Sequence, residues 1–430
     1  AYRHNVFLSR RYAISGRVMP LPGGLEDFSR RIFHCGRTQR HITIPEHTAY
    51  SGINNTPAEA NVTQFHGKTK ICYGRYALET LEELPTSSAF VVTDPFMVKS
   101  GFAEQVTSHL ERRSLPHATF AEVEPDPSLE TVMRGTLEFL RSGADLIVAL
   151  GGGSAIDTAK AISFFAHKAA PELPRPLLVA IPTTSGTGSE VTAISVVTDK
   201  AKGVKIPLND ELLIPDVAIL DARFTRTVPP HVTAATGMDV LTHALEAYTS
   251  RDNNAFTDIL AVQAIRYVFS FLLKAYQQME DMEAREMMLL GSCMAGMAFN
   301  NSGLGLTHSM AHALGGQFHI PHGLANAVLL PYAIRFNSFD AGVRYRELAR
   351  IIGLPHANVE EGISSLIGAV QGLNEAMGIP AHIRDLKVDE AAFRAALDSM
   401  AAHALEDMCT QSNPRRPSLT DIRMLLEQAW

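Results

Sequence analysis

The stretch DLIVALGGGSAIDTAKAI, residues 145–162, joins a short apolar run to a glycine turn and then to a helical pattern. An apolar run of this length before a glycine turn is typical of a strand buried on both faces of a parallel sheet. Similar runs, AFVVTD (89–94) and LLVAIP (177–182), lie on either side of it, and helical patterns separate the three. This alternation predicts βαβ units with right-handed crossovers, and therefore an α/β domain built on a parallel sheet.

The glycine turn has the features of a phosphate-binding loop. Gly151, Gly152 and Gly153 let backbone N–H groups approach an anion closely. Ser154 follows at the start of the helix, where unpaired N–H groups and a partial positive charge favour an anion such as pyrophosphate. The turn does not match the GxGxxG fingerprint of dinucleotide sites. Ser154 followed by Asp157 also resembles a helix capping box, so a purely structural interpretation stays open.

A second polar loop follows the next predicted strand. IPTTSGTGSEVT (181–192) alternates hydroxyls with glycines at the carboxyl end of that strand, where ligands of open α/β sheets bind. Asp94 ends the run AFVVTD, and a carboxylate there can accept hydrogen bonds from an adenosine ribose and repel a 2′-phosphate, which favours NAD over NADP. An aspartate before a proline is also an ordinary turn residue. Two such loops on one sheet favour a nucleotide site.

The second half of the chain has helical spacing. From about residue 231 strand patterns fade, and segments such as DVLTHALEAYTS and AREMMLLGSCMAGMAF follow the helical period. The stretch PPHVTAATG (229–237) has the prolines and glycine of a junction. We therefore expect an α/β domain over residues 61–230 and an all-helical domain over residues 231–430.

Composition excludes several classes of protein. The chain has 430 residues, 46% of them hydrophobic, and a net charge of −7, which argues against a nucleic-acid partner. The four cysteines are scattered without a CxxC pair, as expected of reduced thiols in a cytoplasmic protein. No apolar run approaches the ~18 residues of a membrane helix, and no secretory signal opens the chain.

Residues 1–60 differ from the rest of the chain. They hold eight arginines before position 41, and only LEDFSRRIF shows a helical face, formed by Leu25, Phe28 and Ile32. One interpretation is an appendage that packs on the body or on a partner subunit. A second is a docking or encapsulation segment that recruits a partner enzyme or the shell of a bacterial microcompartment. A transit peptide is a third.

Two pairs of potential metal ligands occur in the helical half. Asp239 and His243 are spaced i, i+4, which places both on one face of a helix, and His308 and His312 repeat that spacing. His322 follows in a Pro-His-Gly loop. One carboxylate with two or three imidazoles suits Fe(II) or Zn(II). Each pair alone is more often a structural contact.

Other features of these stretches refine the metal hypothesis. Glu246 continues the stripe of Asp239 and His243 at i+7, and His319 lies between the later histidines. The HExxH signature of zinc proteases is absent, because no glutamate follows His308 to act as the general base.

These motifs together resemble the iron-containing (group III) alcohol dehydrogenase family. The resemblance is carried by GGGSAIDTAKAI, IPTTSGTGSEVT, GMDVLTHALEAYTS, GLGLTHSMAHALGGQFHIPHGLANAVLLP and LEDMCTQSNPRRPSL, in the family's order, over residues 64–430. The nearest subgroup is that of the bacterial propanol, ethanol and lactaldehyde dehydrogenases. The resemblance implies a dehydroquinate synthase-like fold, with the site in the cleft between the two domains and a homo-oligomeric assembly.

The resemblance also implies residue roles. The metal ligands would be Asp239, His243, His308 and His322, with Fe2+ as the ion and Zn2+ or another divalent ion as the alternative. His312 would be a catalytic residue beside the nicotinamide and the substrate, and His319 would lie outside the ligand set. The NAD-binding set would be Asp94, Gly152, Gly153, Ser154, Asp157, Thr183, Thr184 and Lys205.

The implied reaction is metal-assisted hydride transfer between NAD(H) and a short-chain aldehyde or its primary alcohol, such as propanal or acetaldehyde. The alternatives are a lactaldehyde, diol or glycerol-type dehydrogenase, an elimination enzyme of the dehydroquinate synthase type, a metallohydrolase, and a non-catalytic scaffold recruited through residues 1–60. The intact metal and cofactor motifs argue against the scaffold as the only role.

Overall fold

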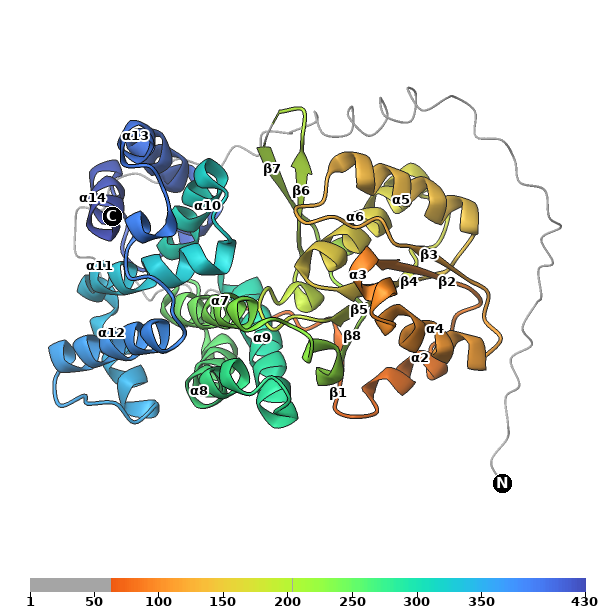
Figure 1. Cartoon of the computed structure of the whole chain (residues 1–430), viewed down its shortest axis with the longest axis horizontal. Helices are drawn as coiled ribbons and strands as arrows, with labels where there is room; N and C mark the ends of the chain where they lie inside the picture. Colours follow the sequence, from red (N-terminus) through yellow and green to blue (C-terminus); the bar gives the residue numbers. More distant parts are fainter. Residues whose placement is uncertain (1–62, 203) are drawn as a thin grey trace, which may run out of the picture. The chain divides into compact units, whose positions relative to one another are not determined.

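The computed structural model describes residues 63–202 and 204–430, all within a unit that extends from Pro57 to Trp430. The N-terminal segment 1–60, its helix over LEDFSRRIF and its docking role lie outside the described residues. Within the described residues, a parallel sheet with its helices is followed by a helical half (Figure 1).

The sheet has six parallel strands, as the alternation of apolar runs predicts. Their order is β1-β8-β5-β4-β2-β3. The three runs identified from the sequence are its central strands, and residues of all three are almost completely buried. The strands are β1 (Lys70–Tyr73), β2 (Ala89–Thr93), β3 (His117–Phe120), β4 (Leu146–Gly151), β5 (Leu177–Pro182) and β8 (Val217–Leu220).

Helices cover both faces of this sheet (Figure 1). On one face Val106 and Leu110 of α4 pack against alternate strand residues such as Val91, and on the other Val132 of α5 and Ile156 of α6 do so. A parallel sheet buried in this way explains the continuous apolar runs. The helices of this half are α2 (Thr80–Glu83), α3 (Pro95–Lys99), α4 (Phe102–Arg112), α5 (Leu129–Ser142) and α6 (Gly153–Ala169), with short 3₁₀ turns at Ala77–Glu79, Ser189–Val191, Glu211–Leu213 and Ala222–Thr225.

A separate antiparallel pair, β6 (Ile194–Asp199) and β7 (Val204–Asn209), follows the second polar loop. The sequence analysis did not identify this hairpin. Its strands alternate between buried or half-buried and more exposed residues, a weaker signal than the continuous apolar runs of the main sheet.

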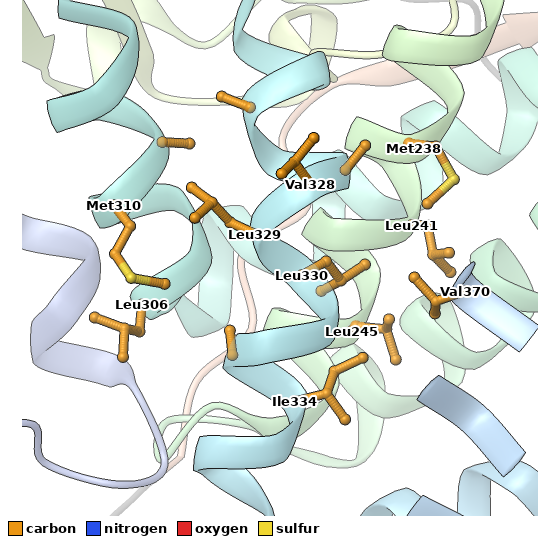
Figure 2. Packing of buried hydrophobic residues seen from close by; sticks show 14 of the residues in the cluster. Met238, Leu241, Leu245, Leu306, Met310, Val328, Leu329, Leu330, Ile334 and Val370 are labelled. Carbon is orange, nitrogen blue, oxygen red and sulfur yellow. The ribbon is translucent and has the colours of Figure 1, made fainter. Parts of the chain in front are cut away.

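The helical half packs around long apolar helices. Figure 2 shows Leu241 and Leu245 of α7 facing Leu330 and Ile334 of α11. Replacing one such fully buried leucine by alanine costs about 2–5 kcal/mol. The helices are α7 (Pro230–Thr249), α8 (Ala255–Gln277), α9 (Met282–Ser302), α10 (Leu306–Phe318), α11 (His322–Ile351), α12 (Val359–Ala376), α13 (Glu390–Glu406) and α14 (Leu419–Ala429), with 3₁₀ turns η5 (Ile383–Leu386) and η6 (Met408–Ser412).

The predicted junction over residues 229–237 lies mostly inside α7. Pro229 caps this helix and Pro230 is its first residue, a position where proline needs no N–H partner and its fixed φ suits the helix. The prolines therefore mark the first turn of α7, so most of the stretch predicted as a junction is helical.

One described helix, α8, is long and apolar enough to cross a membrane by length and composition, which the search for apolar runs overlooked. In the structure α8 packs against α7 and α9, and Ala261, Ile265, Val268 and Leu272 are buried there. A helix in the core of a helical bundle meets the same length and composition test.

Candidate active site

Three helices bring together the four predicted metal ligands. Asp239 and His243 lie one turn apart on α7, His308 lies in the first turn of α10, and His322 is the first residue of α11. One donor atom from each lies within 4.8 Å of the others. Asp239 Oδ1 is 3.7 Å from His308 Nε2 and 3.5 Å from His322 Nε2. The four side chains can therefore share one ion.

A close contact between α7 and α11 holds His322 in this position. A Cβ atom at residue 323 would lie only 2.2 Å from the Ala235 carbonyl oxygen, so only glycine fits beside α7. Pro321 caps α11 in an extended conformation, which turns the chain into the helix at His322. The Pro-His-Gly sequence thus places an imidazole against α7.

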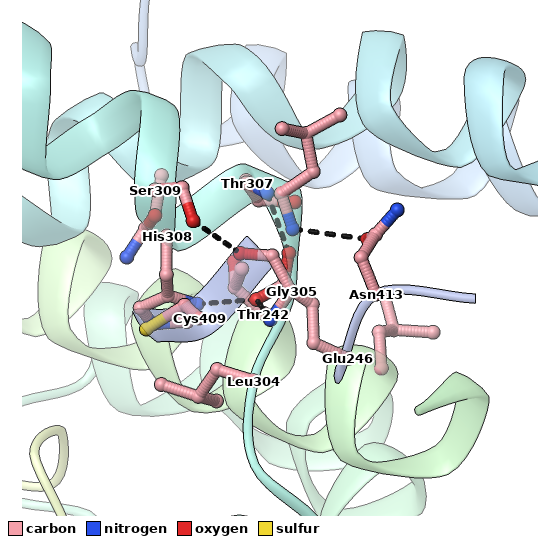
Figure 3. A network of polar contacts seen from close by, with 12 residues as sticks. Thr242, Glu246, Leu304, Gly305, Thr307, His308, Ser309, Cys409 and Asn413 are labelled. Atoms are coloured by element: carbon pink, nitrogen blue, oxygen red, sulfur yellow. Dashed lines mark hydrogen bonds and ion pairs between the residues drawn. The ribbon is translucent and has the colours of Figure 1, made fainter. Parts of the chain in front are cut away.

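Glu246, one turn beyond His243, orients His308 (Figure 3). Its Oε2 accepts hydrogen bonds from His308 Nδ1 at 2.6 Å and from the Gly305 N–H at 2.8 Å, and its Oε1 accepts one from the Thr307 N–H at 2.6 Å. Because Nδ1 donates to a carboxylate, the neutral form of His308 has its lone pair on Nε2, directed toward Asp239.

The buried donors fit a cation. His308 is 1% exposed, yet its Nε2 has no hydrogen-bond partner in the part of the chain that the structure describes, and His243 Nδ1 also lacks one there. Burial opposes a charge on His308, but Glu246 and Asp239 outweigh it and raise the pKa of His308 to about 9. Burial lowers the pKa of His243 to about 4, so this ring stays neutral. The carboxylates therefore favour one positive charge here, beside neutral nitrogen donors.

Asn326 completes the surroundings of the ligands. Its Nδ2 donates to Asp239 Oδ1 at 2.7 Å and lies 3.1 Å from His322 Nε2. The side chain is fully buried. Asn326 on α11 therefore helps to fix the Asp239 carboxylate of α7.

His312 lies beside the ligand set and belongs to a different contact. Its ring stacks on His322 with centroids 5.2 Å apart, and its Nδ1 is 2.8 Å from Asp407 Oδ2. Burial opposes ionisation of Asp407, but the hydrogen bond with His312 prevails and lowers the pKa of that carboxyl to about 2. With Nδ1–H donated to Asp407, the lone pair of the neutral His312 ring is on Nε2. His319 ends α10 in a left-handed conformation and is outside the ligand set.

The residues predicted to hold a nucleotide lie at the carboxyl ends of three neighbouring strands. Asp94 follows β2, Gly152 and Gly153 follow β4, and Thr183 follows β5, where its N–H donates to the Gly151 carbonyl at 3.0 Å. Gly152 caps α6 without any side-chain bond, so the capping-box interpretation of Ser154 is wrong and the first N–H groups of α6 have no side-chain cap. Thr184 is adjacent, since a Cβ at Gly152 would lie 3.4 Å from its hydroxyl.

Asp94 combines two roles. Its Oδ1 accepts a hydrogen bond from the Met97 N–H and so caps α3, with Pro95 at the first helical position. Its Oδ2 makes no hydrogen bond to the described residues, and it faces the glycine turn, 3.4 Å from where a Cβ of residue 151 would be. The turn-residue interpretation therefore applies, and one carboxylate oxygen stays free for a ligand.

Two other members of the predicted nucleotide set are engaged within the protein. Asp157 is half-buried and accepts hydrogen bonds from Ser189 Oγ at 2.6 Å and the Val196 N–H at 2.9 Å. Lys205 is on β7 and pairs with Asp126 at 2.5 Å. Asp157 therefore ties α6 to the second polar loop, and Lys205 contacts a surface carboxylate.

The second polar loop approaches the metal-binding helix. A Cβ at Gly186 would lie 2.8 Å from the side chain of Thr236, which is three residues before Asp239 on α7. Beneath this loop, the fully buried Lys160 donates to Ser189 Oγ, Thr192 Oγ1 and the Ile194 carbonyl. Burial lowers the pKa of Lys160 to about 8 and raises that of the neighbouring Glu190 to about 7.

Sequence reasoning did not assign Asp407, Asn326, Lys160 or Glu190. Asn326 carries a local signal, because it lies at i+4 from His322 on α11. Asp407 carries none, since 95 residues separate it from His312. The sequence placed Glu246 on the same helix face as Asp239 and His243 but gave it no role. The structure shows that its carboxylate accepts a hydrogen bond from His308 on α10.

Comparisons with known proteins agree with this geometry. Residues 68–222 match the family model described as iron-containing alcohol dehydrogenase, and residues 233–430 match the model of the C-terminal part of the Fe-containing alcohol dehydrogenase family. The chain is 42% identical to an NADPH-dependent butanol dehydrogenase of Clostridium saccharobutylicum, covering 83% of this chain and 95% of that protein. It is 40% identical to the 1-propanol dehydrogenase PduQ of Citrobacter freundii, covering 85% and 99%. A crystal structure of a 1,3-propanediol oxidoreductase superposes with a TM-score of 0.81 at 35% identity, covering 86% of this chain and all of that one.

Proposed function

This chain belongs to the iron-containing alcohol dehydrogenase family, and from that premise we propose that it interconverts a short-chain aldehyde and its primary alcohol with NAD(H). Propanal with 1-propanol and acetaldehyde with ethanol are the proposed pairs, in the direction that regenerates NAD+. The observation that carries the proposal is the convergent ligand set, three of whose four members are buried and in which His308 Nε2 has no hydrogen-bond partner among the described residues. The names of the relatives, a butanol and a 1-propanol dehydrogenase, support a small alcohol.

Asp239, His243, His308 and His322 would hold the divalent cation, proposed to be Fe2+. Bound there, the ion would supply Lewis acidity toward a carbonyl oxygen, while the nicotinamide supplies the hydride. Glu246 and Asn326 would hold the ligand atoms in their binding orientation before the ion arrives.

His312 is proposed to carry the proton that the alcohol oxygen gains or loses. Asp407 holds the Nδ1–H of this ring, so the tautomer with a free Nε2 is favoured. The side chain is 44% exposed, so Nε2 can exchange its proton with solvent. The ring also lies against the ligand His322, within reach of a substrate beside the cation.

The nucleotide would lie across the strand ends, with its pyrophosphate at Gly152, Gly153 and Ser154. Thr183 and Thr184 would contact it from the second loop. The free Oδ2 of Asp94 would accept a ribose hydroxyl and repel a 2′-phosphate, which favours NAD. Asp157 would act indirectly by fixing the second loop, and Lys205 would reach the nucleotide only after leaving Asp126.

The decisive experiment is a panel of aldehydes assayed with NADH and with NADPH, with metal content measured on the same sample. Propanal, acetaldehyde, butanal, lactaldehyde and dihydroxyacetone cover the proposed substrates and the diol and polyol alternatives. We expect turnover of the short unsubstituted aldehydes with NADH, in proportion to bound iron. Full turnover by metal-free protein, or binding of neither nucleotide, would refute the proposal.

The role of residues 1–60 needs its own test. We propose that they recruit the enzyme to a partner enzyme or a microcompartment shell, or pack on a partner subunit of a homo-oligomer. Deleting them should leave turnover in solution unchanged and abolish co-localisation with the partner. Co-localisation that survives the deletion would exclude the docking role, and a changed oligomeric state would favour the subunit contact.

A further inference from the structure

A second cluster of potential ligands adjoins the proposed active site. It consists of His312 on α10, Asp407 at the N-cap of η6, and Cys409 within η6. One donor atom from each of the three lies within 4.8 Å of the other two. Asp407 joins the group, because its Oδ2 is 2.8 Å from His312 Nδ1 and its Oδ1 accepts a 2.8 Å hydrogen bond from the Cys409 N–H.

The donor types of this cluster differ from those of the first. The first set offers a carboxylate and three imidazoles, whereas this one offers an imidazole, a carboxylate and a sulfur. Sulfur with nitrogen donors suits thiophilic ions such as Zn2+ and Cd2+. A thiolate and a carboxylate also neutralise a dication fully, and the 44% exposed His312 leaves a route for an ion and a water molecule as fourth ligand.

Cys409 stays protonated until a cation arrives. Burial and the Asp407 carboxylate raise the pKa of its thiol well above the usual value, so it is a poor nucleophile. A metal ion bound beside the carboxylate offsets that penalty, and the thiol proton then leaves to solvent. A thiol held against a carboxylate and an imidazole thus suits metal capture better than redox chemistry.

We propose that His312, Asp407 and Cys409 form an inhibitory site for a thiophilic divalent cation such as zinc. Coordination replaces the hydrogen bond between His312 Nδ1 and Asp407, so the imidazole proton moves to Nε2. The metal-bound ring is then neutral and protonated at Nε2, so it can neither accept a proton from the alcohol nor form the imidazolium that gives a proton up in aldehyde reduction. The inhibition rests on the role proposed for His312, but binding of the cation does not.

Cadmium binding to the iron-loaded enzyme tests the site without relying on activity. In a Cys35→Ser, Cys72→Ser background, Cys293 and Cys409 are the remaining thiols. Titration with Cd2+ should produce the ultraviolet thiolate-to-cadmium absorption band, saturating at one equivalent and releasing protons. Cys409→Ser should abolish the band. The matched control is Cys293→Ser, which removes a buried thiol of α9 that is outside both ligand clusters.

Activity measured in the same titration tests the inhibition. We expect Cd2+ and Zn2+ to lower turnover at least tenfold, and Cys409→Ser to need at least tenfold more ion, while iron content stays constant. A band that persists in Cys409→Ser, no band in the parent, or inhibition that tracks iron release would overturn the site. Cys409→Ala is a second variant for the case that Cys409→Ser folds poorly. It should keep the melting temperature of the parent and also lack the band. If the protein turns over no aldehyde, the absorption band still decides the binding.

Discussion

In the helical half, polar side chains from three helices converge on one buried point, whereas at the edge of the sheet the binding surface consists of glycine turns and backbone N–H groups. The first arrangement depends on which side chain stands at each position, as with His308 and its partner Glu246. The second depends on the absence of side chains, because a Cβ atom at Gly151 or Gly186 would lie under 3.0 Å from neighbouring atoms. Losing a side chain should therefore damage the metal centre, and gaining one should damage the nucleotide edge.

The largest expected effect of this contrast is at His308. His308→Ala removes a buried imidazole whose Nε2 has no hydrogen-bond partner among the described residues. We expect loss of bound metal and a fall in turnover of about a thousandfold or more, while NADH still binds to the sheet half. Metal analysis, aldehyde reduction and NADH fluorescence on one sample measure all three. Loss of NADH binding together with the metal would show that the two regions are not separable.

Glu246→Gln should have a smaller effect on the same centre. The amide keeps the shape of the side chain but no longer favours the tautomer of His308 with its lone pair on Nε2. We expect metal affinity to fall about 10–100-fold with the fold preserved. Competition with a metallochromic chelator gives the affinity. Glu283→Gln, an exposed carboxylate on α9, is the control and should change nothing.

Gly151→Ala tests the sheet edge from the opposite direction. Gly151 has φ of +151°, and an added Cβ would lie 2.6 Å from the Cβ of Ala155. We expect a loss of about 1–3 kcal/mol of stability and a raised KM for NADH, with metal content unchanged. Gly316→Ala in α10 has no atom within 4 Å of the added group and should be neutral or stabilising by up to about 1 kcal/mol. Equal effects of the two substitutions on urea unfolding would contradict the contrast.

The smallest effect concerns Glu190 beneath the second loop. Its folded pKa is raised from 4.5 to about 7 by burial, so the folded state binds more protons than the unfolded state between those values. The free energy of unfolding should therefore fall as pH rises through that window, by on the order of 1–3 kcal/mol from this group. Glu190→Gln should remove that slope. Urea titrations of both proteins across the window give the difference, and parallel curves would show that Glu190 does not titrate there.

Features that depend on local sequence period could be predicted from the sequence, whereas contacts between distant segments could not. The strands at 89–94, 145–150 and 177–182 and the proximity of Asp239 to His243 depend on local period, and the structure places all of these as expected. The role of Asp157 depends on Ser189, 32 residues away, and that of Asp407 on a helix 95 residues earlier. Local spacing cannot encode contacts of that kind. The junction predicted at 229–237 shows the reverse case: α7 begins at Pro230, and proline has the same local appearance in a loop and at a helix start.

All four proposed ligands, and the Glu246 and Asn326 that orient them, belong to α7, α10 and α11, so the coordination shell is the property of a single half of the molecule. The nucleotide loop touches that half through contacts such as that of Gly186 with Thr236. Any breathing motion that separates this loop from α7 would therefore let a spent dinucleotide depart while the ion remains resident. With the ion and the dinucleotide bound as proposed, metal retention over many catalytic cycles would not depend on how fast the coenzyme is exchanged.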